Sequence, residues 1–333
     1  MKKIFVAILA LAAAACSNED IVSVNREAIG FDNAFINNSV RSVVDPSYSN
    51  TNLFGDFAVY GYVTTNEGTG TLFDGTKVSG SALNGDWTYE GTQYWIKDAT
   101  YNFYAVAPNS YKGYWMASTS NVNGLVLSVQ NPDGTKDILV AKANDIVGQQ
   151  AGQNDPVEFN FQHILSKVKF SFTNNYDATG SSIRVENIKI NNACGANFVT
   201  LSKNNLQWSN GDGSKATLNF GNAAVASATA EEAFTNGTTV ESYNERLLIP
   251  VAVNGGYNVT FDVKVLVNGV VVKTYSHDVN VDFTPVAGHS YNIAATINRE
   301  TINPDEELDP IEFTVTDITG WDEDADDVPL PLN

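Results

Sequence analysis

Apolar and polar residues alternate along much of this chain, and that alternation constrains its fold more than any other feature. The clearest run has an apolar residue at every second position: Tyr257, Val259, Phe261, Val263, Val265 and Val267. A period of two is typical of a β-strand with one buried face. Related runs occur at 57–63, 101–105, 166–173, 291–297 and 311–315, and no long amphipathic helix pattern follows the N-terminal segment. The sequence therefore predicts an all-β fold.

The run at 257–267 is followed by Asn268-Gly269, a pair typical of β-hairpin turns. A two-residue loop would place Tyr275 opposite Asp262 and would mix apolar and polar side chains on one face. A three-residue loop pairs Phe261 with Tyr275 instead and keeps the apolar side chains together. We therefore predict the three-residue loop.

Turn clusters rich in Asn, Gly, Asp and Pro separate the strand-like runs, a spacing typical of β-sandwiches. The chain has 333 residues. Single cores stop growing at roughly 250–300 residues, so two domains are expected. We place a signal peptide at 1–15, a lipidated tether at 16–28, two β-sandwiches at 29–158 and 159–321, and an acidic tail at 322–333. The alternation changes phase at Asn187, which predicts a β-bulge there.

The N-terminus has the features of an export signal. A basic start, Met1-Lys2-Lys3, precedes an apolar run at residues 4–15 and then Cys16. This run is shorter than the roughly 20 residues of a membrane-spanning helix and is typical of a secretory signal peptide. The cysteine at the junction makes it resemble a bacterial lipoprotein signal, in which acyl chains such as palmitate are attached to the thiol. An ordinary signal peptide that happens to contain a cysteine is the alternative.

The four residues after Cys16, Ser-Asn-Glu-Asp, resemble the acidic export signal of Bacteroidetes surface lipoproteins. We therefore expect a surface-exposed lipoprotein of the cell outer membrane, anchored there by lipid. Several acyl chains are needed for stable attachment, because one chain alone binds a membrane weakly.

Charge and cysteine content exclude several classes of protein. The net charge is −19, which disfavours contact with nucleic acid, so we expect no nucleic-acid partner. Apart from Cys16 the sequence contains a single cysteine, Cys194, so no internal disulfide framework is expected. A buried, inert thiol is the favoured interpretation of Cys194, and a nucleophile is the alternative.

Catalytic and metal-binding signals are weak in this sequence. The histidines are isolated: His163, His277 and His289 have no zinc-like spacing to cysteines, carboxylates or each other. No nucleophile elbow, phosphate-binding loop or dinucleotide motif is present. We therefore expect no cofactor, no metal and no enzymatic activity. A hydrolase with two facing carboxylates is the alternative, and the acidic run at 322–327 is interpreted as a solvated tail, not a calcium loop.

Aromatic residues are concentrated between residues 87 and 115. They are Trp87, Tyr89, Tyr94, Trp95, Tyr101, Phe103, Tyr104, Tyr111, Tyr114 and Trp115. Buried rings would fill a sandwich core, which is the favoured interpretation. Exposed rings among Trp87, Trp95 and Trp115 would instead form a sugar-stacking platform. The alternative function is therefore a surface glycan-binding lipoprotein of a polysaccharide-uptake system.

Several segments together resemble the fimbrillin family of Bacteroidetes, the subunits of type V pili. They are the lipoprotein signal at Cys16 and the segments 29–31, 57–62, 101–108, 161–170 and 287–293. Their order and spacing carry the resemblance, which spans nearly the whole chain. It implies two tandem transthyretin-like β-sandwich domains, exported as a lipidated precursor.

The resemblance also implies processing and polymerisation. In the family a trypsin-like protease cuts after an arginine, which removes the lipid anchor and the first strand, and a strand of the next subunit fills the groove. The candidate cleavage residue here is Arg41, with Arg26 as the alternative that would leave the strand attached. The groove residues of the first strand would be Ile29, Phe31 and Phe35. Expected partners are other fimbrial subunits in a head-to-tail polymer, with a host or bacterial surface receptor as a further candidate.

The donor strand is less well defined. Alternating apolar residues occur at 311–315 and at 328–332, but Pro329 and Pro331 would lose backbone hydrogen bonds in the second run. Only a short acidic tail follows Trp321. Stalk, tip, anchor and accessory roles in a fimbria therefore all remain open.

Overall fold

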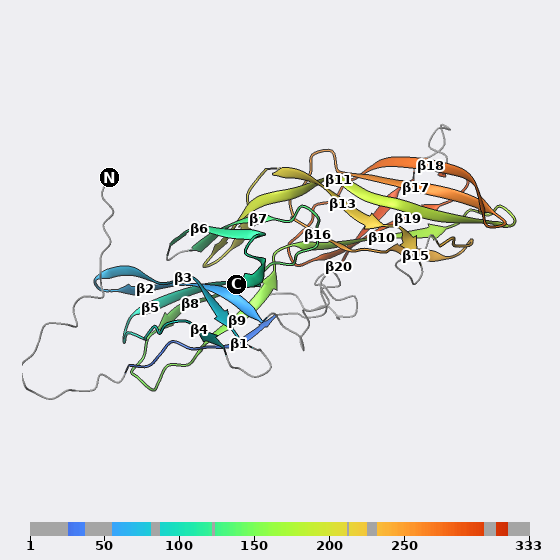
Figure 1. Cartoon of the computed structure of the whole chain (residues 1–333). Helices are drawn as coiled ribbons and strands as arrows, with labels where there is room; N and C mark the ends of the chain where they lie inside the picture. Colours follow the sequence, from blue (N-terminus) through green and yellow to red (C-terminus); the bar gives the residue numbers. More distant parts are fainter. Residues whose placement is uncertain are drawn as a thin grey trace, which may run out of the picture.

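We describe the protein from a computed structural model, which defines residues 26–36, 55–80, 87–121, 124–211, 213–224, 232–302 and 311–318. For 33–36, 118–121 and 318 it defines the backbone alone. These ranges contain strands and one short 3-10 helix, η1 (Asn109–Tyr111), with no α-helix (Figure 1). The all-β prediction is therefore confirmed. No helix in these ranges is long and apolar enough to cross a membrane.

The strands have the following bounds. They are β1 (Phe31–Ile36), β2 (Asp56–Thr65), β3 (Gly68–Ser79), β4 (Thr88–Tyr89), β5 (Thr100–Ala107), β6 (Trp115–Asn121), β7 (Gly124–Gln130), β8 (Leu139–Val147), β9 (Val157–His163), β10 (Ser166–Asn174), β11 (Ser181–Ser202), β12 (Leu206–Trp208), β13 (Ser214–Gly221), β14 (Ala223–Ala224), β15 (Thr239–Ser242), β16 (Arg246–Leu248), β17 (Tyr257–Val267), β18 (Val270–Val281), β19 (Ser290–Ile297) and β20 (Phe313–Ile318).

The first sheet has the strand order β1-β9-β8-β5-β2-β3-β4. β1 runs parallel to β9, and the other neighbours are antiparallel. Both faces of this sheet are covered, so alternate residues of β2 enter two different cores. Phe57 and Val59 lie in one core, and Ala58 and Tyr60 lie in the other.

The second and third sheets meet the first through one long strand. The second sheet has the order β18-β17-β11-β7-β6, and the third has the order β14-β15-β10-β19-β20. β11 is 22 residues long. Its first part pairs with β17, and its last residues pair with β7 (Figure 1). One strand therefore lines the core at both ends of the elongated molecule.

Three cores result from this arrangement. One lies between the third sheet and the β11–β17 part of the second sheet, around Phe170 and Val263. Another lies between the first sheet and β6, β7 and the end of β11, around Tyr104 and Trp115. The remaining core covers the opposite face of the first sheet and includes Phe31.

Three strand pairings cross the boundary expected between residues 158 and 159: β1–β9, β8–β9 and β7–β11. β9 spans this boundary and pairs with β8 and β1 of the first sheet. β6 and β7 precede it in sequence but belong to the second sheet, next to β11. Residues before and after this boundary therefore share the same sheets.

The predicted register of the β17–β18 hairpin is wrong. The turn has two residues, Asn268 and Gly269, both with positive φ (51° and 78°), and Val267 pairs with Val270. A bulge follows, because Val265 pairs with Lys273. Positive φ at both turn residues suits the twist of a hairpin, and the bulge shifts the register so that apolar residues stay on one face.

Two smaller predictions are confirmed. The pairing of β11 with β17 shifts register between Glu186 and Lys189, and Asn187 has a φ of 58°, so the predicted bulge is present. Asn is among the residues that most readily adopt this left-handed conformation. The Cys194 thiol is buried, as expected for a structural cysteine.

Candidate functional site

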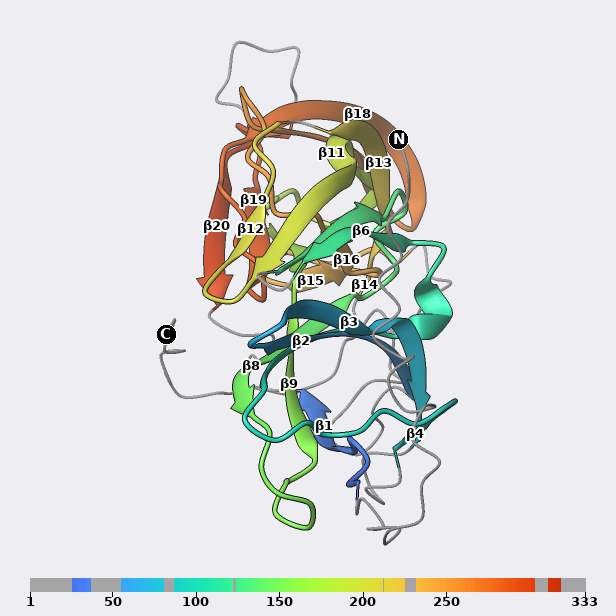
Figure 2. The same ribbon diagram turned by 90° about the vertical axis from the view of Figure 1, so that its left-hand side faces the viewer.

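The N-terminal segment at residues 27–36 lies in a slot between two backbone partners. On one side, Ile29 N–H donates to Gln93 O (2.8 Å) and Trp95 N–H donates to Glu27 O (3.0 Å). On the other side, Val157 N–H donates to Gly30 O (2.8 Å), and β1 then continues parallel to β9. Figure 2 shows β1 beside β9, on the side of β2 and β3 away from β11. We call this region, occupied by residues 27–36, the first-strand slot.

Phe31 is the centre of an aromatic cluster in this slot. Its ring is buried and lies with its centroid 5.5–6.2 Å from those of five other rings: Phe57, Phe73, Tyr89, Phe103 and Phe159. The Phe159 ring is stacked on it, and the other four are edge-on. These are the arrangements that aromatic pairs prefer. The N-terminal strand therefore completes the core of the first sheet.

Two polar side chains hold the start of the same segment. Glu27 Oε2 accepts hydrogen bonds from Gly152 N–H (2.9 Å), Asn154 N–H (3.1 Å) and Asn154 Nδ2 (2.5 Å). The Tyr89 hydroxyl donates to Ile29 O (2.8 Å). The hydrogen bond from the Asn154 side chain is the main cause that holds the pKa of Glu27 below its ordinary value. Glu27 therefore fastens the segment before it enters the core.

We expect acid to weaken this attachment through Glu27. A carboxyl whose pKa is lower in the folded state stabilises the fold above its unfolded pKa, and that contribution is lost as the pH falls through the folded pKa. Glu27→Gln should therefore reduce the loss of thermal stability below about pH 4.3, the ordinary pKa of Glu. Melting temperatures measured from pH 7 to pH 3 test this. Glu67→Gln, in the exposed turn after β2, serves as the control and should keep the wild-type profile. Parallel profiles for wild type and Glu27→Gln would contradict the expectation.

The sequence-predicted site residues are placed as follows. Ile29 and Phe31 are both buried in the core beneath the first sheet. The backbone of Phe35 pairs with Asn160 of β9, and its side chain lies outside the described part of the structure. Cys16 and Arg41 also lie outside the described residues, as does the tail at 322–333.

Sequence reasoning missed Glu27 and Tyr89. Glu27 falls in the segment expected to be a tether, and one carboxylate in a polar stretch gives no signal of its partners. Tyr89 was one aromatic residue among many. Only the tertiary structure brings its hydroxyl to a backbone oxygen 60 positions earlier.

The tryptophans that a sugar-stacking platform would need are buried. Trp87, Trp95 and Trp115 are only 6%, 8% and 1% exposed. Trp115 Nε1 also donates to Pro108 O (3.1 Å), which satisfies its polar atom inside the core. The prediction of a core-filling aromatic cluster is confirmed for these rings, and the glycan-binding alternative loses the observation on which it depended.

Two of the three histidines, His163 and His277, pack inside the fold. His163 Nδ1 lies 2.9 Å from Asp137 Oδ2, and both side chains are buried. The His277 ring is stacked on Phe261 with centroids 4.9 Å apart, and burial lowers the pKa of His277. Within the described ranges no group of three or more His, Cys, Asp or Glu side chains is arranged to hold a metal ion.

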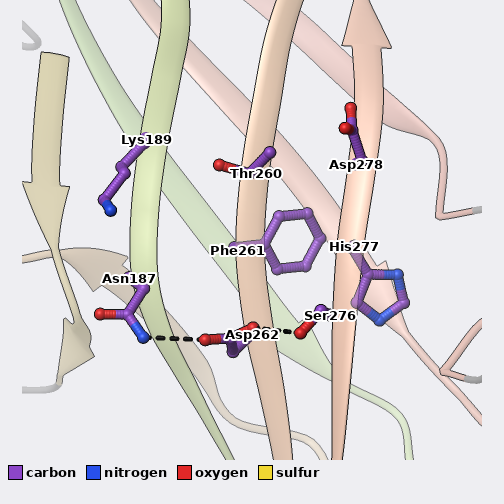
Figure 3. Close-up of a pocket in the computed structure, with 8 residues that line it drawn as sticks. All are labelled: Asn187, Lys189, Thr260, Phe261, Asp262, Ser276, His277 and Asp278. Atoms are coloured by element: carbon purple, nitrogen blue, oxygen red, sulfur yellow. Dashed lines mark hydrogen bonds between the residues drawn. The ribbon is translucent and has the colours of Figure 1, made fainter. Parts of the chain in front are cut away.

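A shallow cavity of about 490 Å³ lies on the β11–β17–β18 surface (Figure 3). Among its lining residues, Asp262 accepts hydrogen bonds from Asn187 Nδ2 (2.8 Å) and Ser276 Oγ (2.6 Å). Partial burial acts to raise the pKa of Asp262, but these hydrogen bonds and two nearby lysines outweigh it, so the pKa lies below its ordinary value. The carboxylate is therefore already engaged, and its contacts hold the bulge at Asn187 in place.

The fold and the slot define an all-β protein whose N-terminal strand completes its own core. A family model described as Fimbrillin-like matches residues 41–321, and the chain belongs to this family. The resemblance seen in the sequence is thereby confirmed. Membership supports a role as a fimbrial or adhesive subunit at the cell surface, with other fimbrial components as partners.

Several solved structures are similar to this chain. A candidate cell adhesion protein from Bacteroides uniformis has 18% identity and a TM-score of 0.49, covering 90% of this chain and 100% of that one. A candidate cell adhesion protein from Bacteroides ovatus has 15% identity and a TM-score of 0.46, covering 91% and 99%. The fimbrial anchor protein Mfa2 from Porphyromonas gingivalis has 12% identity and a TM-score of 0.38, covering 89% and 100%. No match was found among curated proteins.

Proposed function

We propose that the chain is a structural or adhesive subunit of a cell-surface fimbria, assembled by strand addition. In this proposal it is exported as a lipoprotein tethered to the outer membrane through Cys16. Cleavage after Arg41 then releases the tether together with residues 27–36. A strand of a neighbouring subunit enters the emptied first-strand slot. The observation that supports this most directly is the position of Phe31, a core residue carried by an edge strand.

Because β1 lies at the edge of the first sheet, it can be removed without breaking the pairings between the other strands. β1 is the terminal strand of the order β1-β9-β8-β5-β2-β3-β4, so its loss leaves the other pairings in place. The sequence from residue 37 to residue 55 connects it to β2 and contains Arg41. A single cut in this connection separates the first strand from the body.

Removal of β1 creates a strong driving force for replacement. It exposes the edge of β9 and the aromatic rings around Phe31, together with the backbone groups of Gln93, Trp95 and Val157 that the segment occupied. An exposed strand edge accepts another strand, because main-chain hydrogen bonds provide affinity and alternate side chains set the register. A donor on one subunit and a slot on the next form a contact that need not close, so it propagates as a filament.

The N-terminus of the mature protein tests this proposal. We expect mass spectrometry of surface material from cells expressing the full chain to show a terminus at Ser42, together with high-molecular-weight polymer. Arg41→Ala should abolish both and retain lipidated Cys16. Arg26→Ala is the matched control and should be processed like the wild type. Termini at Cys16 alone in the wild-type protein, or unchanged processing of Arg41→Ala, would contradict the proposal.

A further inference from the structure

We propose that the first-strand slot selects its partner by an aromatic ring. The partner is an extended segment that runs parallel to β9. Its sequence has an aliphatic residue and, two positions later, an aromatic residue, which pairs with Val157. This inference rests on the proposed function, because the slot must first be emptied. Beyond that function, the inference specifies which strand sequences the slot accepts.

The walls around Phe31 are shaped for a flat ring. The ring planes of Phe57 and Phe103 lie at 90° and 89° to that of Phe31 in T-shaped pairs, and the Phe159 ring is stacked on it at 14°. An aliphatic side chain of similar volume can fill part of this space, but it provides neither the edge-on nor the stacked contact. The site is therefore complementary to an aromatic ring in orientation as well as in size.

These walls have little freedom to close around a smaller side chain. Phe73 and Phe103 pack directly against the backbone of Gly61, where an added Cβ would lie 2.6 Å from Phe73 Cδ2 and 2.9 Å from Phe103 Cδ1. Both rings are completely or almost completely buried. A cavity left by a missing ring in such a packed core collapses only in part, so its cost persists.

Backbone hydrogen bonds determine the position in the bound strand that the aromatic residue must occupy. The residue in the position of Ile29 donates its N–H to Gln93 O, and its carbonyl accepts from the Tyr89 hydroxyl. The next carbonyl, that of Gly30, accepts from Val157 N–H. Tyr89 also contacts the Phe31 ring, with centroids 5.7 Å apart. A strand shifted by one residue would keep these backbone partners but would turn its ring away from the core.

The same sequence pattern is used at another edge of the molecule. Ile311 is buried, and Phe313 of the edge strand β20 contacts three rings with centroid distances of 5.8–6.1 Å: Phe170, Phe172 and Phe261. In both places a buried aliphatic residue precedes the edge strand, and the aromatic ring two positions later, at the start of the strand, contacts a group of phenylalanines. The recurrence supports the view that this sequence pattern is what allows an edge strand to pack on the core.

Peptide binding to the cleaved protein tests the inference. A specific protease site placed in the connection at residues 37–54 allows the first strand to be cut, and a labelled peptide of residues 26–37 in excess replaces it. Binding is followed by fluorescence anisotropy. The Phe31→Leu peptide should bind at least about tenfold more weakly, a difference of about 1.4 kcal/mol. A peptide in which Phe31 and Asp32 are exchanged is the matched control for composition and should fail to bind.

The outcomes separate this inference from the proposed function. If the wild-type and Phe31→Leu peptides bind with affinities within twofold of each other, the slot accepts strands without reading a ring, and only the present inference is overturned. If neither peptide binds, the slot does not accept strands at all, and the proposed function fails with it. In this comparison of peptides the changes are in the peptide alone, so the fold of the protein is the same for each of them. As a second measurement, Phe159→Leu in the protein should weaken binding of the wild-type peptide more than that of the Phe31→Leu peptide.

Discussion

Replacing Phe31 by alanine should lower the free energy of unfolding of the intact chain by about 3–5 kcal/mol, the range for truncating a buried phenylalanine. The ring is 3% exposed and contacts five other rings, so its loss leaves a cavity at the centre of the aromatic cluster. The urea midpoint of the uncleaved protein, followed by tryptophan fluorescence, measures the effect, because Trp87 and Trp95 lie in the same core.

Phe198→Ala is the matched control for this experiment. Phe198 lies in β11 and is 51% exposed, so its truncation should change stability by no more than about 0.5 kcal/mol. Equal urea midpoints for Phe31→Ala and Phe198→Ala would show that the first strand contributes little to the core. The proposed role of residues 27–36 as the occupant of a slot would then lose its basis.

Replacing Trp115 by alanine should also cost about 3–5 kcal/mol of unfolding free energy. Trp115 is 1% exposed and lies in the core between the first sheet and the β6–β7–β11 part of the second sheet. It also makes the hydrogen bond to Pro108 O (3.1 Å). Its removal therefore opens a cavity where the two sheets meet and removes one of two hydrogen bonds to Pro108 O, which also accepts from Tyr111 N–H (3.1 Å).

The neighbouring residue provides the control for Trp115. Met116 is 56% exposed, because successive side chains of a strand point to opposite faces. The free energy of unfolding of Met116→Ala, measured with denaturant, should lie within about 0.5 kcal/mol of the wild-type value. A Trp115→Ala protein as stable as Met116→Ala would mean that the ring is dispensable for packing, which would reopen a binding role for it.

Local patterns in the sequence were sufficient for several of the strands and for the side that each of these buries. The family resemblance placed Ile29 and Phe31 in the groove of the first strand, and both are buried. Alternation located the bulge at Asn187, because a residue that breaks the phase must leave the ladder. The β17–β18 register was missed, since two combinations of turn and bulge keep the same apolar face inward, and alternation alone does not distinguish them.

The candidate site could be predicted only in part for a related reason. The apolar pattern shows that Phe31 needs a partner face, but it does not identify rings as distant in sequence as Phe159. The contacts of Glu27 depend on a loop near residue 152 that folds back beside the N-terminus. Such contacts arise from chain topology and carry no short-range signal.

Alternating side chains, together with a turn such as Asn268-Gly269, determined from the sequence alone that this chain forms strands and which residues need burial. Tertiary structure decided the rest: that β11 serves both ends of the molecule, that β1 is an edge strand beside β9, and that Phe31 meets five rings. The physical reason is that strand identity depends on neighbours two residues away, whereas strand pairing and ring packing depend on which distant segments close one core.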